Sequence, residues 1–259
     1  MKHALITGAS KGIGRAIAQE LAARGVHVVL VARDRFLLEE LAVELKATHK
    51  IDARYFAVDL ASADAIAQVY HWISEQQIQI HILVNNAGYG LSGPFESYTA
   101  AEHEEMMRVN MNVPVALTSA FLPHLKRNHP SYVLNIVSSA AYQSVPGLST
   151  YAASKAFMLS FSRGLRYELR KQGISVTAVS PGSTDTGFAT RAKVGQKGLK
   201  AAEKVNMTPE AVAKIAVKAM YGKKAEVITG FINQLGAFLV WLLPKKLAEK
   251  TAAGIYELD

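Results

Sequence analysis

Tyr151 and Lys155 lie four positions apart in the run Tyr151-Ala152-Ala153-Ser154-Lys155, and together they have the chemistry of a proton-transfer pair. Residues at this spacing share one face of a helix. A free phenol has a pKa of about 10 and is a poor base at neutral pH, but a neighbouring ammonium favours the phenolate. Tyr151 is therefore a candidate acid/base, with Lys155 as its partner. The pattern alone is weak evidence, because a tyrosine packed beside a surface lysine has the same spacing.

Two serines, Ser138 and Ser139, follow the apolar run Val133–Val137, thirteen and twelve residues before Tyr151. A side chain at the carboxyl end of a strand in an open α/β sheet lies at the edge where ligands bind. A hydroxyl there could bond a substrate carbonyl and stabilise a developing alkoxide. Ser138 is the preferred candidate and Ser139 the alternative.

A glycine-rich segment, Thr7-Gly8-Ala9-Ser10-Lys11-Gly12-Ile13-Gly14, follows the first apolar run and opens a helical pattern. Glycine suits tight turns and close approach of the backbone to a phosphate, and the positive end of a helix favours a pyrophosphate. The spacing Gly-x3-Gly-x-Gly differs from the commoner G-x-G-x-x-G. A plain strand-to-helix turn is the alternative, but the position at the start of a βαβ series favours dinucleotide binding.

The end of the second apolar run indicates which dinucleotide binds. An acidic residue there bonds the ribose 2′-hydroxyl of NAD, whereas a nearby arginine accommodates the 2′-phosphate of NADP. Ala32 stands where the acid is expected, Arg33 follows it, and Lys11 can reach the same region. Two cations around one phosphate predict NADP(H) as the cofactor. Asp34 and Arg35 are better explained as the polar cap of the next helix.

These groups need a scaffold, and the order of apolar patterns predicts an α/β fold. Val- and Ile-rich runs without polar alternation indicate strands that are covered on both faces. Alternation with helical patterns predicts one doubly wound Rossmann-type domain over residues 1–259, with a mainly parallel, roughly seven-stranded sheet flanked by helices. The expected strands are Ala4–Ile6, Val26–Val31, Tyr55–Val58, Ile80–Val84, Val133–Val137, Val176–Val179 and Val227–Ile228. The expected helices include Gly14–Arg24, Phe36–Thr48, Ala63–Gln76 and Glu102–Arg127.

Composition excludes some classes of chemistry and partner. The chain has no cysteine, so thiolate metal sites and cysteine nucleophiles are excluded, and its scattered histidines predict no metal site. We expect no signal peptide at the amino terminus and a cytoplasmic protein. The net charge of +8 is concentrated after residue 190, but no nucleic-acid motif accompanies it, so no nucleic-acid partner is expected.

The last quarter of the chain contains two features of a substrate site. Residues 183–207 are rich in small and basic residues and are expected to form a substrate-binding loop. Residues 230–259 include the apolar stretch Phe231 to Leu243, followed by Pro244-Lys245-Lys246. The preferred explanation is that this segment covers the substrate pocket or a subunit interface. Peripheral contact with a membrane is the alternative, because an apolar-then-basic order suits an interface.

The combined motifs resemble the short-chain dehydrogenase/reductase family in its shorter form. The matches run in the family's order from residue 7 to residue 186: TGASKGIG at Thr7–Gly14, Asp59-Leu60, NNAG at Asn85–Gly88, Asn110, Ser138, YAASK at Tyr151–Lys155 and PGSTDT at Pro181–Thr186. The resemblance implies an NADP(H)-dependent oxidoreductase that transfers hydride between the nicotinamide and a carbonyl or secondary alcohol. A nucleotide-binding sensor without turnover is the rival, but such proteins usually lose the tyrosine or the lysine.

The resemblance also implies individual roles. Asn110, Ser138, Tyr151 and Lys155 would be catalytic, with Asn110 holding a water that links Lys155 to solvent. Asp59 would bond the adenine amine. Taken alone, Asp59 could equally be a helix cap and Asn110 a satisfied core amide. The cofactor-binding residues would be Gly8, Ser10, Lys11, Gly12, Ile13, Gly14, Arg33, Asp59, Leu60, Asn86, Ala87, Gly88, Tyr151, Lys155, Pro181, Gly182, Thr184 and Thr186.

The substrate and the assembly are expectations of the same kind. An apolar pocket wall predicts a hydrophobic ketone, such as a lipid, acyl or steroid-like molecule, over a sugar. The residues expected there are Tyr89, Leu91, Pro94, Phe95, Tyr142, Val145, Pro146 and the loop from Phe188 onward. The resemblance implies a homodimer or homotetramer that pairs through the helices at Glu102–Arg127 and Ala152–Lys171.

Overall fold

A parallel β-sheet forms the centre of the protein in the computed structural model, which describes residues 1–203 and 206–255. Within these residues seven strands pair in the order β3-β2-β1-β4-β5-β6-β7, and every pair is parallel. The strands are β1 (Lys2–Thr7), β2 (His27–Ala32), β3 (Ala53–Ala57), β4 (Gln79–Asn85), β5 (Ser131–Ile136), β6 (Ile174–Ser180) and β7 (Glu226–Ile228). The predicted fold class is confirmed, and each strand contains or overlaps the run that predicted it.

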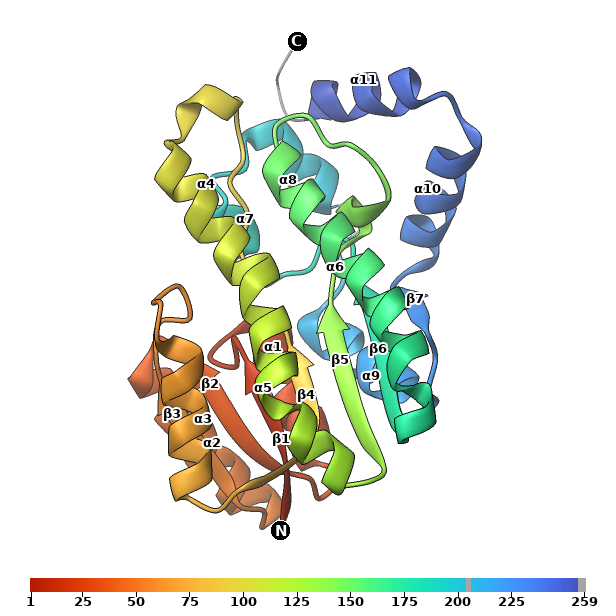
Figure 1. Cartoon of the computed structure of the whole chain (residues 1–259). Coiled ribbons are helices and arrows are strands. Elements are labelled where there is room, and N and C mark those ends of the chain that lie inside the picture. The colour runs from red at the N-terminus through yellow and green to blue at the C-terminus, as the bar shows by residue number, and fades with distance from the viewer. Residues whose placement is uncertain (204–205, 256–259) are drawn as a thin grey trace.

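Helices cover both faces of the sheet (Figure 1). The α-helices are α1 (Gly12–Ala22), α2 (Arg35–His49), α3 (Ala65–Glu75), α4 (Ala100–Met107), α5 (Val113–Arg127), α6 (Ser149–Leu169), α7 (Phe188–Arg191), α8 (Gln196–Glu203), α9 (Pro209–Tyr221), α10 (Phe231–Leu242) and α11 (Lys245–Ile255). Short turns of 3₁₀-helix occur at η1 (Phe95–Ser97), η3 (Ser139–Tyr142) and η4 (Arg170–Gln172). The Asp34 side chain accepts a hydrogen bond from the Leu37 N–H and caps α2, as predicted.

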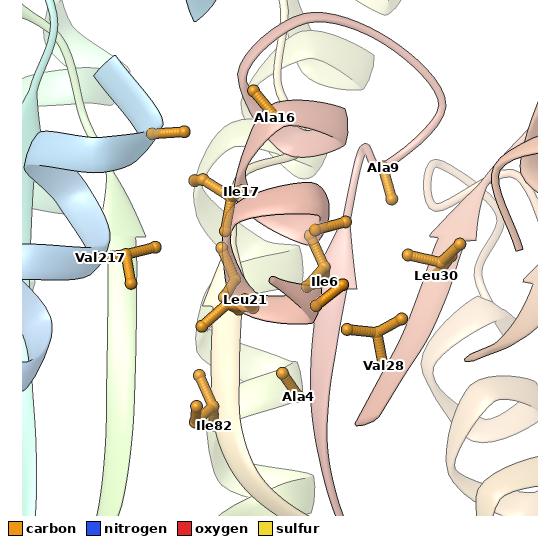
Figure 2. Packing of buried hydrophobic residues seen from close by; sticks show 14 of the residues in the cluster. Ala4, Ile6, Ala9, Ala16, Ile17, Leu21, Val28, Leu30, Ile82 and Val217 are labelled. Carbon is orange, nitrogen blue, oxygen red and sulfur yellow. The ribbon is translucent and has the colours of Figure 1, made fainter. Parts of the chain in front are cut away.

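The core divides into layers because successive strand residues point to opposite faces. Ile6 of β1 belongs to the cluster that packs beneath α1, α2 and α9, while Leu5 belongs to the cluster beneath α3 and α5. Figure 2 shows Ile17 and Leu21 of α1 between Ile6 and Val217 of α9. Burial on both faces explains the uninterrupted apolar runs, and it holds the carboxyl ends of the strands in fixed positions.

The strand order reverses direction between β1 and β4. From β1 the chain adds β2 and β3 on one side and then returns to add β4 to β7 on the other. In such sheets the crevice for a ligand lies beyond the carboxyl ends of the strands at this reversal. The glycine-rich segment after β1 and Asn86 after β4 both lie there, and the Asn86 amide donates to the Thr7 and Gly8 carbonyl oxygens at 2.9 and 3.2 Å.

The helix predicted at Glu102–Arg127 is interrupted, and this is a correction to the sequence interpretation. The chain forms α4, then a π-helical turn, η2 (Arg108–Asn112), and then α5. A π-turn adds one residue to the helical repeat and often marks a functional site. Asn110 lies in this turn and is buried.

The carboxyl-terminal helices border the crevice. The loop predicted at residues 183–207 contains α7 and α8 in its described part. Beyond β7, α10 and α11 form an angled pair at the edge of the molecule, well away from the amino-terminal strands (Figure 1). Among the described residues, no helix has the length and apolar character needed to cross a bilayer.

Gly14 provides a test of how tightly α1 packs on the glycine-rich segment. A Cβ at Gly14 would overlap the Gly8 carbonyl oxygen and lie 2.8 Å from the Gly8 carbonyl carbon. We expect Gly14→Ala to lower the free energy of unfolding by about 1–3 kcal/mol because backbone atoms would have to move. Gly164, on α6, has open space around its Cβ position. Gly164→Ala should instead raise the free energy by about 0.5–1 kcal/mol. Urea denaturation of both variants measures the difference, and an equal effect would contradict it.

Candidate active site

A cavity of about 1390 Å³ lies at the carboxyl edge of the sheet and joins the glycine-rich segment to α6. Ligand sites for drug-sized molecules are usually about 300–1,000 Å³, so this cavity has room for a large ligand or for two. Lys11 and Arg33 line one part, Tyr151 and Lys155 another, and α10 a third. One continuous space therefore connects the groups that the sequence singles out.

Most of the predicted site residues line this cavity. Of the catalytic and cofactor-binding sets, only Gly14 and Asn110 lie outside the wall, since Gly14 packs against Gly8 and Asn110 is buried behind it. Of the predicted substrate-pocket residues, Tyr89, Tyr142, Val145 and Phe188 line the cavity. Leu91, Pro94, Phe95 and Pro146 lie outside this wall. Phe95 instead stacks on His103 with ring centroids 4.6 Å apart, so it packs on α4.

Tyr151 and Lys155 lie one turn apart on α6, as their spacing predicts. The Lys155 Nζ atom is 5.8 Å from the centroid of the Tyr151 ring. The Tyr151 ring packs against Phe188 of α7, with centroids 5.1 Å apart, and Tyr151 is buried. The Lys155 ammonium donates to the Ile136 carbonyl oxygen at 3.1 Å. Contacts from β5 and α7 thus hold both side chains at the cavity.

Burial changes the acidity of Lys155. Desolvation disfavours the charged ammonium and lowers its pKa from 10.5 to about 8. A lysine with a pKa near neutrality can give up and regain a proton during turnover. Gly88 makes room for this group, because a Cβ there would lie 2.9 Å from Asn110 Oδ1 and 3.4 Å from Lys155 Nζ.

We expect the ¹³Cε NMR signal of Lys155 in the ligand-free protein to titrate near pH 8, below the pH range of the other lysines. Because the folded pKa lies below the ordinary 10.5, the unfolded chain binds more protons between pH 8 and 10.5. Lys155 therefore makes the free energy of unfolding rise with pH in that window. Lys155→Met assigns the signal by removing it. A Lys155 signal that titrates together with the surface lysines would contradict the predicted shift.

Asn110 occupies the π-turn and is satisfied inside the protein. Its Nδ2 donates to the Tyr89 carbonyl oxygen at 2.9 Å and to Ser154 Oγ at 3.0 Å, and its Oδ1 accepts from the Tyr89 N–H at 3.1 Å. These bonds fasten the turn to α6 and to the segment after Gly88. They agree with the core-amide interpretation, and the water link from Asn110 to Lys155 stays a prediction.

Ser138 and Ser139 both line the cavity at the end of β5. The Ser138 Oγ accepts a hydrogen bond from the Ala140 N–H at 3.1 Å. Because a hydroxyl can accept and donate at once, this bond orients Ser138 while leaving its proton to donate. The Ser139 N–H donates to the Pro181 carbonyl oxygen at 2.7 Å and joins the ends of β5 and β6.

Two other tyrosines, Tyr89 and Tyr142, line the cavity, and each donates a hydrogen bond from its hydroxyl to a glutamate. Burial, and then the bond from its hydroxyl to Glu105, raise the pKa of Tyr89. Burial, and then the bond to Glu226, raise the pKa of Tyr142. Both phenols therefore hold their protons more strongly than a free tyrosine, which suits structural hydrogen bonds and not proton exchange at neutral pH.

The other part of the cavity carries charges of both signs, because Lys11, Arg33 and Arg191 line it together with Asp34, Asp59 and Glu105. Arg33 is half exposed, and its Nη1 lies 4.0 Å from Asp59 Oδ2. Asp59 also accepts the Ala61 N–H at 3.0 Å, so it stabilises a turn and does not cap a helix. Arg191 of α7 lies over the Tyr89 ring at 4.1 Å, and burial, then the nearby Arg33, lower the pKa of its guanidinium. Arg33 and Arg191 therefore add their positive potentials in this part of the cavity.

The structure identifies two residues that sequence reasoning missed. Arg191 is one of many basic residues after residue 190, and no motif distinguishes it. Asn233 of α10 lies against Gly182 and lines the cavity, with its Nδ2 donating to the Thr229 carbonyl oxygen at 2.8 Å. Only the fold brings α7 and α10 to the ends of the strands.

Comparison with known proteins agrees with this geometry. A family model described as short chain dehydrogenase matches residues 2–197. An uncharacterized oxidoreductase of Staphylococcus saprophyticus is 33% identical over 219 residues, which are 85% of this chain and 91% of that protein. Very-long-chain 3-oxoacyl-CoA reductase-A of Danio rerio is 34% identical over 184 residues, which are 70% of this chain and 57% of that protein. The solved short-chain dehydrogenase from Sphingobium yanoikuyae, in complex with NADPH, has a TM-score of 0.82 at 32% identity, covering 89% of each chain.

The chain belongs to the short-chain dehydrogenase family, since the family model spans most of its length. The protein is therefore an oxidoreductase that acts on carbonyl or alcohol groups with a nicotinamide cofactor.

Proposed function

We propose that this protein is an NADP(H)-dependent oxidoreductase that interconverts a hydrophobic ketone and its secondary alcohol. The observation that carries the proposal is the single cavity of about 1390 Å³ that joins Arg33 and Lys11 to Tyr151 and Lys155. A dinucleotide has one anionic and one reactive end, and this cavity offers Lys11 and Arg33 to the first and Tyr151 and Lys155 to the second.

The residues present fit a nicotinamide dinucleotide. The amino-terminal N–H groups of α1 have no partner within the helix and would hold the pyrophosphate. Lys11 and Arg33, with Arg191 nearby, would hold a 2′-phosphate, and Lys155 would bond the ribose beside the nicotinamide. When bound, the nicotinamide supplies or accepts the hydride. The NADPH complex of the Sphingobium relative supports the choice of NADP(H).

The chain's own residues would move the proton. Ser138 would donate a hydrogen bond to the substrate oxygen and hold it beside Tyr151. In reduction, the Tyr151 hydroxyl would give its proton to that oxygen, and the Lys155 ammonium would stabilise the phenolate left behind. Lys155 would then restore the proton through water held near Asn110. Alcohol oxidation uses the same groups in reverse.

An apolar wall supports a hydrophobic substrate. Beyond Tyr151 the cavity is bounded by residues of three segments, namely Val145, Leu148, Leu239, Val240, Leu243 and Leu247. A sugar would leave its hydroxyls without partners along this wall, at a cost of roughly 1–3 kcal/mol for each buried group. The Danio rerio relative is described as acting on a very-long-chain 3-oxoacyl-CoA, which supports a long apolar ketone as the substrate class.

The test is NADPH oxidation by the purified protein with straight-chain ketones of increasing length, a steroid ketone and a keto sugar. We expect kcat/KM to rise with the apolar surface of the substrate and to be lowest for the sugar. Preference for the sugar would overturn the substrate class. Tight NADPH binding without oxidation by any member of the panel would overturn the proposed reaction.

The cofactor assignment has its own test in Arg33→Ala. We expect this substitution to weaken NADPH binding by about 10- to 100-fold, because one charge-assisted bond to the phosphate contributes about 1.5–3 kcal/mol. NADH binding should stay within about twofold, since it has no 2′-phosphate. Titration calorimetry measures both constants.

The matched control for this variant is Arg35→Ala. Arg35 is also exposed and only two positions away, but it does not line the cavity. Arg35→Ala should leave both dissociation constants unchanged, which separates local contact from general loss of positive charge. If Arg33→Ala weakened NADH and NADPH equally, the phosphate assignment would be wrong.

We also infer that the protein assembles as a homodimer or homotetramer through α4–α5 and α6. Large side chains on α6 support this, since Phe157 and Tyr167 are exposed in the single chain.

A further inference from the structure

The helix α10 has an apolar face that points away from the cavity. Phe231, Leu235, Phe238 and Leu242 recur at intervals of four, three and four residues, which places them on one stripe of the helix. All four are exposed, and Phe231 is 77% accessible. Trp241 is 75% accessible and lies beside Phe238, with ring centroids 6.1 Å apart. We refer to these five residues as the outer stripe.

The opposite side of the same helix already has a role. Asn233, Ala237 and Val240 are the least exposed residues of α10, and all three line the cavity. Packing against the rest of the protein therefore accounts for the apolar character of the inner side only. Single exposed hydrophobic residues are normal, but a continuous apolar surface marks a site of interaction.

Positive charge borders the outer stripe. The segment immediately after α10 carries Lys245, Lys246 and Lys250 against the single acidic residue Glu249, and the three lysines are exposed. The order is apolar and aromatic residues first and basic residues next. An anionic bilayer has hydrocarbon and negative headgroups in adjacent layers, and tryptophan favours the boundary between them.

We propose that the outer stripe of α10 and the lysines of α11 dock this protein on the surface of an anionic lipid bilayer. The contact is peripheral: the stripe inserts among the headgroups while the three lysines bind lipid phosphates. A second copy of this chain fits less well, because a two-fold interface built from α10 and α11 would pair a surface that has three lysines and one acid, Glu249, with an identical surface. The excess of like charge opposes that association.

Docking in this way has a consequence for the cavity. Because α10 supplies both the outer stripe and part of the cavity wall, the bilayer would lie directly beside that wall. An apolar ketone dissolved in the membrane would then reach the cavity without crossing water. This consequence rests on the proposed function, but the docking itself does not.

The direct test uses Trp241 as a reporter of lipid contact. The chain has two tryptophans, so Trp72→Phe leaves Trp241 alone. The full-length variant is mixed, without cofactor or substrate, with vesicles of phosphatidylcholine or of equal parts phosphatidylcholine and phosphatidylglycerol. We expect the protein to float with the anionic vesicles, the Trp241 emission to move to shorter wavelength, and brominated lipid to quench it. Protein that stays in the dense fraction with both vesicles, with unchanged emission, overturns the proposal.

Matched variants separate the two parts of the contact. Phe231→Ser with Phe238→Ser should weaken vesicle binding by about tenfold or more, because less apolar surface leaves water. Lys245→Glu with Lys246→Glu should weaken binding to anionic vesicles by about 30-fold or more and leave the weak binding to neutral vesicles unchanged. The control, Phe36→Ser with Val43→Ser, removes exposed apolar residues of α2 and should bind as the parent does. Circular dichroism and NADPH titration verify the folding of each variant.

One further outcome would identify a different occupant. If the Trp241 emission moved to shorter wavelength without vesicles as protein concentration rose, and light scattering showed a dimer that the Phe231→Ser, Phe238→Ser variant lost, the stripe would be a subunit interface. That result would overturn membrane docking. It would leave the proposed reaction unaffected, because the NADPH oxidation assay measures the reaction independently.

Discussion

Replacing Tyr151 with phenylalanine is expected to lower kcat for ketone reduction by about 10²- to 10⁴-fold, the usual contribution of a positioned acid/base. Phenylalanine keeps the ring that packs against Phe188 and removes only the hydroxyl that would give its proton to the substrate. NADPH affinity should therefore stay within about twofold, and kcat/KM should fall together with kcat, because the lost interaction belongs to the transition state. Steady-state kinetics and calorimetry measure the two quantities.

The matched control is Tyr89→Phe. Tyr89 also lines the cavity, and its hydroxyl donates to Glu105 at 2.8 Å. Removing that hydroxyl should cost stability and change kcat by less than about tenfold, because the proton of Tyr89 is held more strongly than that of a free phenol. If Tyr89→Phe lost as much kcat as Tyr151→Phe, or if Tyr151→Phe were fully active, the assigned acid/base would be wrong.

Local patterns were enough to predict the sheet and the position of the reactive groups. Val28, Val29 and Leu30 form an apolar run because both faces of β2 are covered, and that property is visible in any window of the chain. The glycine-rich segment and the Tyr151–Lys155 pair are likewise local, since a turn and one helical repeat position them. The doubly wound, mainly parallel arrangement followed from the alternation of strands and helices, whereas the order of the strands came from the structure.

Features that depend on distant contacts could not be predicted in the same way. The π-turn at Asn110 exists where the amide bonds the Tyr89 backbone and Ser154 of α6, and no periodicity in Glu102–Arg127 indicates it. Phe95 has the apolar character expected of a pocket residue, but it packs on His103 instead. The roles of the two sides of α10 also could not be predicted, because only the tertiary structure shows which of its residues line the cavity and which form the outer stripe.

Ser138→Ala is expected to lower kcat by about 10²- to 10³-fold, the usual loss when one donor to a developing oxyanion is removed. The Ala140 N–H fixes the Ser138 hydroxyl at 3.1 Å, so its proton is available to the substrate oxygen without reorganisation in the transition state. Ser138→Thr keeps a hydroxyl at the same position and should recover part of the activity. Initial rates at saturating NADPH and ketone measure the series.

Ser139→Ala is the comparison that separates the two serines. Ser139 also lines the cavity, but its bond across the sheet comes from its backbone, whose N–H donates to the Pro181 carbonyl oxygen at 2.7 Å and is retained in alanine. We therefore expect Ser139→Ala to change kcat by less than about tenfold. A large loss in Ser139→Ala together with an active Ser138→Ala would assign the oxyanion donor to Ser139. Equal, large losses in both would show that the two hydroxyls bind the substrate oxygen together.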